Sequence, residues 1–282
     1  MIRTPAPTYQ IATVYTACVD RTEDPVLNEA LAAERARVLT RSASYLEAGA
    51  APSFHTIQPQ QPQNLVHEEL SGIYERVMVQ GGERAVYLGI KARAYLQCCP
   101  LCAHRDVTTL DHYLPKENYP EFAVLPINLV PSCMSCNGAK HTFIPATAGD
   151  QLFHPFFDDW SAFQLLRADV QVTQYIDVDF FIDPAGAPPN VVERAQNHFE
   201  RLQLGSLYAL NAAVELVSKR GELVEHFDGG GTAALASELT REATSRRRPF
   251  RNAWQPALYR ALAASDEFSS GGFNNIDVAP EL

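Results

Sequence analysis

The sequence has little positive charge and no long apolar run, and these two shortages exclude two classes of protein. Lys and Arg number 23 against 33 Asp and Glu, which leaves a formal net charge of −10 over 282 residues. A protein that coats nucleic acid non-specifically needs a positive surface, so this class is excluded, although a local basic site is not. No apolar run approaches the roughly 20 residues of a membrane-spanning helix. We therefore expect no membrane partner.

Cysteine is scarce as well, and the expected cellular compartment indicates whether the few cysteines form disulfides or bind metal. Residues 11–19 are mildly apolar but lack a basic flank and a clear small-residue cleavage site, so we predict no signal peptide and a cytoplasmic location. Cytoplasmic thiols stay reduced, and CxxC pairs there bind metal more often than they form disulfides. Four of the six cysteines fall in two such pairs.

Apolar sequence, in contrast, is plentiful. It makes up 46% of the chain against 20% charged residues, which is enough for a buried core and argues against global disorder. Apolar positions at helical spacing predict a mainly helical protein, with Asp24 capping the first helix and a loose end at 269–282. Helices are predicted at 25–48, 66–77, 83–97, 190–202, 207–227, 232–247 and 253–264, with one or two strands within 170–182.

The two cysteine pairs have the spacing of a zinc site. Cys99, Cys102, Cys133 and Cys136 form CxxC-x30-CxxC. Each CxxC can form a tight knuckle, and two knuckles complete a tetrahedral site of four thiolates. The alternatives are two unrelated buried pairs or a redox CxxC, but a redox motif usually needs one pair in a thioredoxin-like context. The neighbouring Cys98 is a spare thiol, because the spacing favours Cys99 as the ligand.

Polar residues of another kind lie between and just after the cysteines. They are Asp111-His112, Asn128 and Asn137. A neutral imidazole can take a proton from water, while a carboxylate and an amide oxygen suffice for Mg²⁺, which keeps several of its waters. Neighbouring residues of a strand point to opposite faces. Asp111 and His112 can therefore serve one site only from a strand end or a bulge.

Together these residues resemble a known family. The string Leu110-Asp-His-Tyr-Leu-Pro-Lys116, then Asn128-Leu, then Cys133-x-x-Cys136-Asn137-x-x-Lys140 is similar to an HNH endonuclease of the zinc-ribbon type. The resemblance covers residues 98–141 and implies the ββα-metal fold, a β-hairpin and a helix around one metal ion. It implies hydrolysis of DNA to 5′-phosphate and 3′-hydroxyl ends. The expected fold class is thus α+β, with this small module inside a mainly helical protein.

The resemblance also assigns roles to individual residues. His112 is expected to be the general base, with Asp111 facing the catalytic Mg²⁺ or Mn²⁺. Asn128 is expected to hold the loop that bears the histidine. Asn137 stands where many members have His and would offer its amide oxygen to the ion. Lys140 and Lys116 are expected near a substrate phosphate.

Proteins of this layout are common among bacterial restriction and phage-defence nucleases, sometimes with an ATPase. We therefore expect DNA and a regulatory protein such as an ATPase as partners, and a homo-oligomer is a further expectation. The nuclease module is predicted at 93–150, between an N-terminal helical region at 1–92 and a partner-binding or regulatory region at 151–282.

Some alternatives stay open. A zinc ribbon that only binds nucleic acid or protein would use the cysteines but would not need Asp111, His112 and Asn137 together. A nuclease acting on RNA also fits the motif. The basic run at 246–248 with Arg251 is either a DNA contact or an ordinary solvated helix end. We interpret His141, beside the second cysteine pair, as solvated rather than as a substrate contact.

Overall fold

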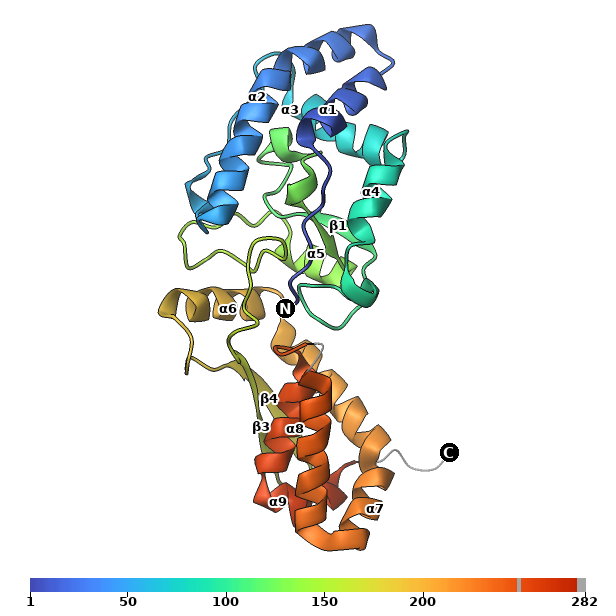
Figure 1. Ribbon diagram of the computed structural model, residues 1–282, viewed down its shortest axis with the longest axis vertical. Helices are drawn as coiled ribbons and strands as arrows, with labels where there is room; N and C mark the ends of the chain where they lie inside the picture. Colours follow the sequence, from blue (N-terminus) through green and yellow to red (C-terminus); the bar gives the residue numbers. More distant parts are fainter. Residues whose placement is uncertain (248–249, 278–282) are drawn as a thin grey trace. The chain divides into compact units, whose positions relative to one another are not determined.

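The computed structural model of the chain describes residues 1–247 and 250–277 (Figure 1). Helices dominate, and the described strands form two separate two-stranded antiparallel sheets, as expected for the α+β class. The chain divides into two compact units, one of Ile2–Asp159 and one of Met1 with the residues from Trp160 onward. Each unit has a core of its own.

The first unit begins with a layer of helices. The second of them, α2, starts where the sequence predicts: the Asp24 carboxylate accepts hydrogen bonds from the backbone N–H groups of Val26 (2.9 Å) and Leu27 (3.1 Å). A π-helical turn, η2, continues α3 directly. The elements are α1 (Ile11–Asp20), α2 (Pro25–Ala50), η1 (Phe54–Thr56), α3 (His67–Ile73), η2 (Tyr74–Val79) and α4 (Arg84–Lys91).

One predicted helix, at 83–97, is too long. Helix α4 ends at Lys91, and the short turn η3 (Tyr95–Gln97) follows with left-handed backbone at Leu96 (φ 51°) and Gln97 (φ 57°). The chain must reverse here, because the carbonyl of Gln97 accepts from Val107 at 2.7 Å and Cys98 forms a β-bridge with Asp106. The approach to the first cysteine pair is therefore a loop.

A β-hairpin and a helix follow and rest on the N-terminal helices. Strand β1 (Thr109–His112) pairs antiparallel with β2 (Leu129–Ser132), and helix α5 (Met134–Lys140) comes next. The turns η4 (Pro120–Phe122) and η5 (Pro126–Asn128) lie between the strands. Leu110 and Leu129 belong to the same buried cluster as residues of α1, α2, α3, η2 and α4. The N-terminal helices thus supply the core on which the hairpin sits.

The second unit combines a hairpin of strands with long helices. Its sheet runs in register from Leu166 opposite Ile182 to Val172 opposite Ile176, so the first strand begins before the predicted window. The elements are β3 (Leu166–Val172), β4 (Ile176–Ile182), α6 (Pro189–Arg201), α7 (Leu204–Arg247), α8 (Trp254–Ala264), α9 (Asp266–Ser269) and η6 (Gly272–Asn275).

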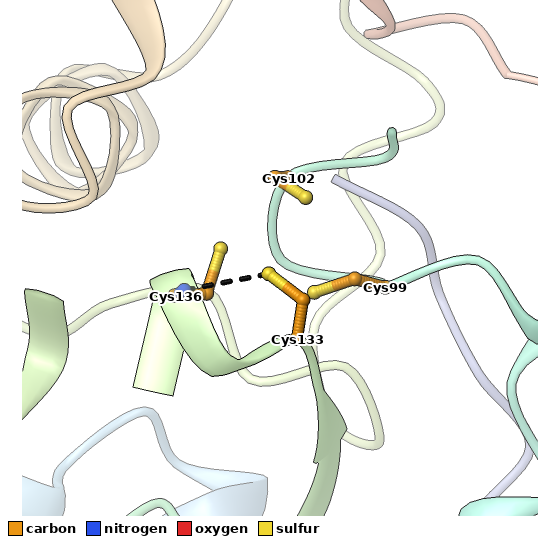
Figure 2. Close-up of side chains that lie close together, drawn as sticks. All are labelled: Cys99, Cys102, Cys133 and Cys136. Carbon is orange, nitrogen blue, oxygen red and sulfur yellow. Dashed lines mark hydrogen bonds between the residues drawn. The ribbon is translucent and has the colours of Figure 1, made fainter. Parts of the chain in front are cut away.

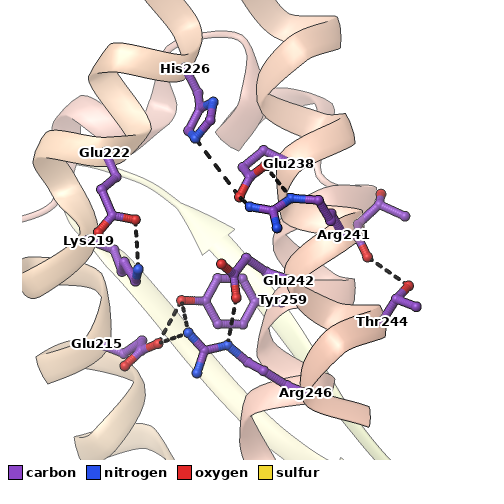
Figure 3. Close-up of polar contacts among 11 residues, drawn as sticks. Glu215, Lys219, Glu222, His226, Glu238, Arg241, Glu242, Thr244, Arg246 and Tyr259 are labelled. Atoms are coloured by element: carbon purple, nitrogen blue, oxygen red, sulfur yellow. Dashed lines mark hydrogen bonds and ion pairs between the residues drawn. The ribbon is translucent and has the colours of Figure 1, made fainter. Parts of the chain in front are cut away.

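Helix α7 is a helical hairpin. Gly231 has φ 67° and ψ −163°, a conformation that glycine adopts without the steric cost of a Cβ, and it separates two arms. The sequence predicted these arms as the helices 207–227 and 232–247. Figure 3 shows the arms facing each other, with Glu215, Lys219, Glu222 and His226 on one and Glu238, Arg241, Glu242 and Arg246 on the other. Side-chain pairs join the arms, His226 with Glu238 and Arg246 with Glu215.

The expected loose end at 269–282 is wrong for its first part. Phe268, Phe273 and Ile276 are buried, so α9 and η6 pack against the second unit; residues 278–282 lie outside the described residues. None of the helices in the described part of the chain combines the length and apolar character that crossing a bilayer requires.

Candidate functional site

The four cysteines predicted to bind zinc lie together. Their sulfurs are all within 4.8 Å of one another, and all four residues are buried (Figure 2). Zinc–sulfur bonds of about 2.3 Å place the sulfurs of a tetrahedral site about 3.8 Å apart, so a small inward movement of the thiols suffices to hold the ion. In the described part of the chain, this group is the one cluster of Cys, His and carboxylate side chains with metal-binding geometry.

The backbone around the cysteines is shaped for a metal. The N–H of Arg105 points to the Cys102 sulfur and that of Cys136 to the Cys133 sulfur, both at 3.4 Å. Hydrogen bonds from the thiols of Cys102, Cys136 and Cys99 hold the pKa of Cys133 far below its usual range. A thiolate is the form that binds zinc. The same hydrogen-bond network raises the pKa of Cys99 and Cys136, so the thiolate is favoured at Cys133. The cluster has the burial and the spacing that a zinc ion requires.

Asp111 and His112 occupy the end of strand β1, as the strand geometry requires for two neighbours that share a site. Both line one pocket of about 630 Å³, together with Asn137 from α5 and Lys116 from the loop after β1. Asp111 is 4% exposed and His112 is 8% exposed, so each presents only a small part of its surface. The hairpin and helix thus bring three of the predicted polar residues to one cavity.

His112 is held in a defined orientation. Its Nε2 lies 2.8 Å from the carbonyl oxygen of Ala123, and because a carbonyl only accepts, we assign the ring proton to Nε2. The Tyr74 ring packs edge-on against the imidazole at a centroid distance of 4.5 Å. Burial lowers the pKa of His112 to about 4. The ring is therefore neutral at neutral pH, with Nδ1 as its basic atom.

Asp111 has a cationic partner inside the protein. The Lys140 ammonium, only 3% exposed, donates to Asp111 Oδ1 at 3.1 Å and to the carbonyl of His112 at 2.7 Å. A third, longer bond joins it to the carbonyl of His141 at 3.4 Å. Burial raises the pKa of Asp111 to about 6, although the charge of Lys140 opposes the shift. The structure thus uses Lys140 to fix the end of β1, and its expected contact with a phosphate stays a prediction.

Asn128 lies outside the pocket and is fully buried. Its side-chain oxygen accepts from the N–H of Leu114 at 2.8 Å, and its amide donates to the carbonyls of Leu114 (3.0 Å) and Phe122 (3.2 Å). Its own carbonyl accepts from the N–H of Tyr113 at 2.9 Å. These four bonds pin the chain that follows His112. Asn128 can therefore act on the site only by holding this loop.

Asn137 and Lys116 are more accessible than the residues of the hairpin. Asn137 is partly exposed on the first turns of α5, and its side chain borders the pocket. The Lys116 ammonium pairs with Glu117 Oε1 at 3.3 Å at the pocket margin, with its side chain 25% exposed. Both are placed where a bound ion or a phosphate could reach them.

The pocket lining also includes residues to which the motif assigned no role. Tyr74 and Glu75 come from the π-helical turn η2, Glu117 follows Lys116, and His141 comes directly after α5. Our interpretation of His141 as simply solvated is thus incomplete, since it is exposed at the pocket edge with φ 47°. Tyr74 lies 38 positions before His112 in the sequence, so only the fold brings the two together. A π-helical turn in a wall of the pocket is a common feature of functional sites.

Comparison with known proteins identifies two relatives. The chain is 30% identical over 213 residues to protein Ea31 of Escherichia phage lambda, a match that spans 70% of this chain and 67% of Ea31. It is 30% identical over 96 residues to the Septu protein PtuB of Bacillus thuringiensis, spanning 31% of this chain and 37% of PtuB. No family model matches the sequence. No solved structure matches it either.

Proposed function

The chain belongs to the family of the phage lambda protein Ea31, and we propose that it is a metal-dependent HNH endonuclease that hydrolyses DNA. The observation that carries the proposal is one cavity bordered by a buried carboxylate, a neutral imidazole and an amide. Asp111, His112 and Asn137 reach this cavity from a hairpin and a helix joined to a four-cysteine cluster. A zinc ribbon that only bound nucleic acid or protein would have no use for this convergence.

The cysteine cluster has a structural role in this proposal. Zinc held by four thiolates leaves no open position for substrate, so the ion would stabilise the fold and not take part in the chemistry. Cys133 follows β2 directly and caps α5, where its sulfur accepts the N–H of Cys136. Zinc at this point would fix the angle between the hairpin, which bears Asp111 and His112, and the helix, which bears Asn137.

His112 would activate the attacking water. Its Nε2–H bond to Ala123 leaves Nδ1 as the proton acceptor, and Nδ1 has no hydrogen-bond partner among the described residues. The edge-on contact with Tyr74 limits rotation of the ring. A fixed neutral imidazole is suited to remove a proton from water beside a phosphodiester.

Asp111 and Asn137 would hold Mg²⁺ or Mn²⁺. They supply two oxygen ligands and the cavity has room for water, which suits an ion that keeps much of its hydration shell. The ion would stabilise the charge that develops on the phosphate and on the leaving oxygen. Lys140 already pairs with Asp111 Oδ1, so it would orient the carboxylate and compete with the ion for its charge. Lys116, at the margin, is the better placed of the two lysines for a phosphate.

The biological setting follows from the relatives and from the shape of the chain. One relative comes from a phage and the other from a bacterium, which favours a role in the contest between phages and their hosts. We assign the nuclease to anti-phage defence or restriction, acting with a regulatory protein such as an ATPase. The second unit, from Trp160 onward, is the candidate surface for that partner or for a second copy of the chain.

A plasmid cleavage assay tests the nuclease. The purified full chain, supplied with Mg²⁺ or Mn²⁺, should nick or linearise supercoiled DNA. The variant His112→Ala should be slower by about a hundredfold to ten-thousandfold, the usual contribution of a general base. His226→Ala removes a histidine of the second unit and should cleave like the unaltered chain. Equal rates for the unaltered chain and His112→Ala would contradict the assignment.

Two additional measurements separate the alternatives. A labelled single-stranded RNA in the same reaction would be cut faster than DNA if RNA were the natural substrate. DNA binding without cleavage, unaffected by His112→Ala and by either ion, would instead indicate a zinc ribbon without catalysis. Zinc content measured on the same protein should be one ion per chain, and its absence with all four thiols intact would contradict the cage.

A further inference from the structure

A second pocket, in the unit that begins at Trp160, has a concentration of positive charge that the site above does not use. It measures about 360 Å³ and lies between the end of α7 and α8. Its charged lining consists of Arg247 and Arg260, and the rest is made of two threonines and three alanines. No acidic residue lines it, although the chain as a whole carries a net charge of −10. We call it the Arg247–Arg260 pocket.

Arg260 is a partly buried cation without a counter-ion. Its Nη2 donates to the carbonyl of Leu166 at 3.0 Å, and its Nε donates to the Gln164 amide oxygen at 3.0 Å. Its Nη1 is buried and has no acceptor among the described residues. Burying a guanidinium without a carboxylate or another full acceptor set is costly, so an anionic ligand would relieve the imbalance.

Neighbouring cations increase the excess of positive charge around Arg260. The Gln164 oxygen also accepts a hydrogen bond from Arg167 Nη1 at 2.7 Å, which brings a third guanidinium close to Arg260. Arg167 itself forms an ion pair with Asp183 at 2.9 Å. Burial, and then repulsion from Arg167 and Arg247, lower the pKa of Arg260 to about 10. The first basic residue of the run, Arg246, is already paired with Glu215 and Glu242. Arg247 and Arg260 have no ion-pair partner in the described part of the chain.

The helix dipole explains one of the two arginines but not the other. A cation at a helix C-terminus is stabilised by the helix dipole, which accounts for Arg247 at the end of α7. Arg260 is in the interior of α8, where that explanation fails. The Thr240 and Thr244 hydroxyls donate to the helix carbonyls of Ala236 and Thr240, so Arg247 and the Nη1 of Arg260 supply the remaining donors of the pocket. Two uncompensated guanidinium groups match the charge and the oxygen geometry of phosphate.

We propose that the Arg247–Arg260 pocket binds a phosphate group, carried either by a nucleic-acid backbone or by a free phosphorylated compound. Binding here does not require the nuclease activity proposed above. The proposal assigns phosphate binding to Arg247 of the basic run at 246–248, while Arg246 of the same run has a structural role.

Binding measurements on the His112→Ala protein, without added divalent ion, test the pocket independently of cleavage. The probes are a short fluorescein-labelled DNA duplex, followed by anisotropy, and adenosine monophosphate and inorganic phosphate, followed by calorimetry. Arg247→Glu alters an exposed side chain and should fold normally. It should weaken at least one probe by about tenfold or more, as expected for a lost charge-assisted contact.

Arg241→Glu is the matched control, because it makes the same charge change on the same arm of α7, six positions earlier, where Arg241 pairs with Glu238. Arg260→Lys keeps the charge but removes the planar fork and should weaken the same probe less than Arg247→Glu does. An effect on the duplex alone, with a salt slope lower by about one, identifies a backbone phosphate. An effect on the small anions identifies a free phosphorylated compound. Equal affinities of Arg247→Glu and Arg241→Glu for all three probes would overturn the proposal.

Discussion

One charged pair in each unit of this protein illustrates two different environments for charge. In the first unit the pair Lys140–Asp111 is almost fully buried, with side chains 3% and 5% exposed. In the second unit the pair Arg246–Glu215 lies between the arms of α7 with side chains 24% and 20% exposed (Figure 3). Buried pairs leave an uncompensated charge when they are broken, whereas pairs near solvent are screened. Breaking the Lys140–Asp111 pair should therefore destabilise the candidate site strongly, whereas breaking the Arg246–Glu215 pair should destabilise the helical hairpin only slightly.

The position of the tryptophans allows this contrast to be measured. Both tryptophans, Trp160 and Trp254, belong to the second unit. Their fluorescence therefore reports unfolding of that unit, while hydrogen exchange of the β1, β2 and α5 amides reports the first. Two units with separate transitions also require separate free energies of unfolding, because a single two-state value would not be defined.

The largest effect is expected from loss of the cysteine cluster. Cys133→Ser, or removal of zinc with a chelator, should abolish protection of the β1, β2 and α5 amides, since structural zinc contributes on the order of 10 kcal/mol in small zinc modules. The tryptophan transition should stay in place. Cys98→Ser is the matched control, because Cys98 lies outside the cluster and its loss should leave exchange unchanged. Exchange that survives Cys133→Ser would show that the helices hold the hairpin without metal.

Lys140→Met should have the next largest effect. It leaves the Asp111 carboxylate buried without its cation, which costs about 3–5 kcal/mol when a buried pair is broken. Lys116→Met, at the partly exposed margin of the same pocket, should cost less than about 1 kcal/mol. Urea unfolding followed by exchange in the first unit measures both. Similar losses for the two lysines would contradict the role of burial.

The Lys140→Met effect should also depend on pH. The pKa of Asp111 is raised to about 6 in the folded chain, against about 3.9 for a free Asp. Without the Lys140 charge that opposes this shift, the folded pKa should rise further. A folded state that binds its proton more tightly than the unfolded state loses stability as pH rises through that window. The variant should therefore be closest to the unaltered chain near pH 5 and weakest near pH 8.

Lys140 also marks the limit of what the sequence could predict. The cysteine spacing, the Asp24 cap and the two arms of α7 follow from local patterns, and the structure places them as expected. The position of Lys140 in the motif predicts a phosphate contact. Its burial depends on how α5 packs against β1, and no local sequence pattern indicates that packing. Tyr74 and Glu75 reach the pocket from a separate helix for the same reason. The early end of α4 at Lys91 was hidden because reversing the chain requires left-handed residues at Leu96 and Gln97, which are not glycines.

Asn128→Ala should have an intermediate effect. It removes three side-chain hydrogen bonds and leaves buried backbone groups of Leu114 and Phe122 without partners, at a cost of about 2–3 kcal/mol. Because these bonds pin the loop after His112, the cleavage rate should fall even where the first unit stays folded. Asn118→Ala changes an asparagine in the same loop and serves as the control. Full cleavage activity in folded Asn128→Ala would show that the loop needs no such clamp.

Glu215→Gln should have the smallest effect. It removes the charge that pairs with Arg246 Nη2 at 3.1 Å but can still accept from the Tyr259 hydroxyl, now at 2.6 Å. Arg246 keeps its second partner, Glu242, at 3.0 Å, and its guanidinium stays over the Tyr259 ring at 4.7 Å. The loss should therefore be at most about 1 kcal/mol, the upper range for solvent-accessible pairs.

The tryptophan transition in urea measures this loss directly, since Trp254 begins α8, the helix that bears Tyr259. Raising the salt concentration should shrink it further, because accessible charges are screened while a buried pair is not. Lys140→Met measured under the same two salt conditions should show no such reduction. A salt-independent loss of several kcal/mol in Glu215→Gln would mean that the arms of α7 close over their charges in solution. The two units would then not differ in the way their charged pairs contribute to stability.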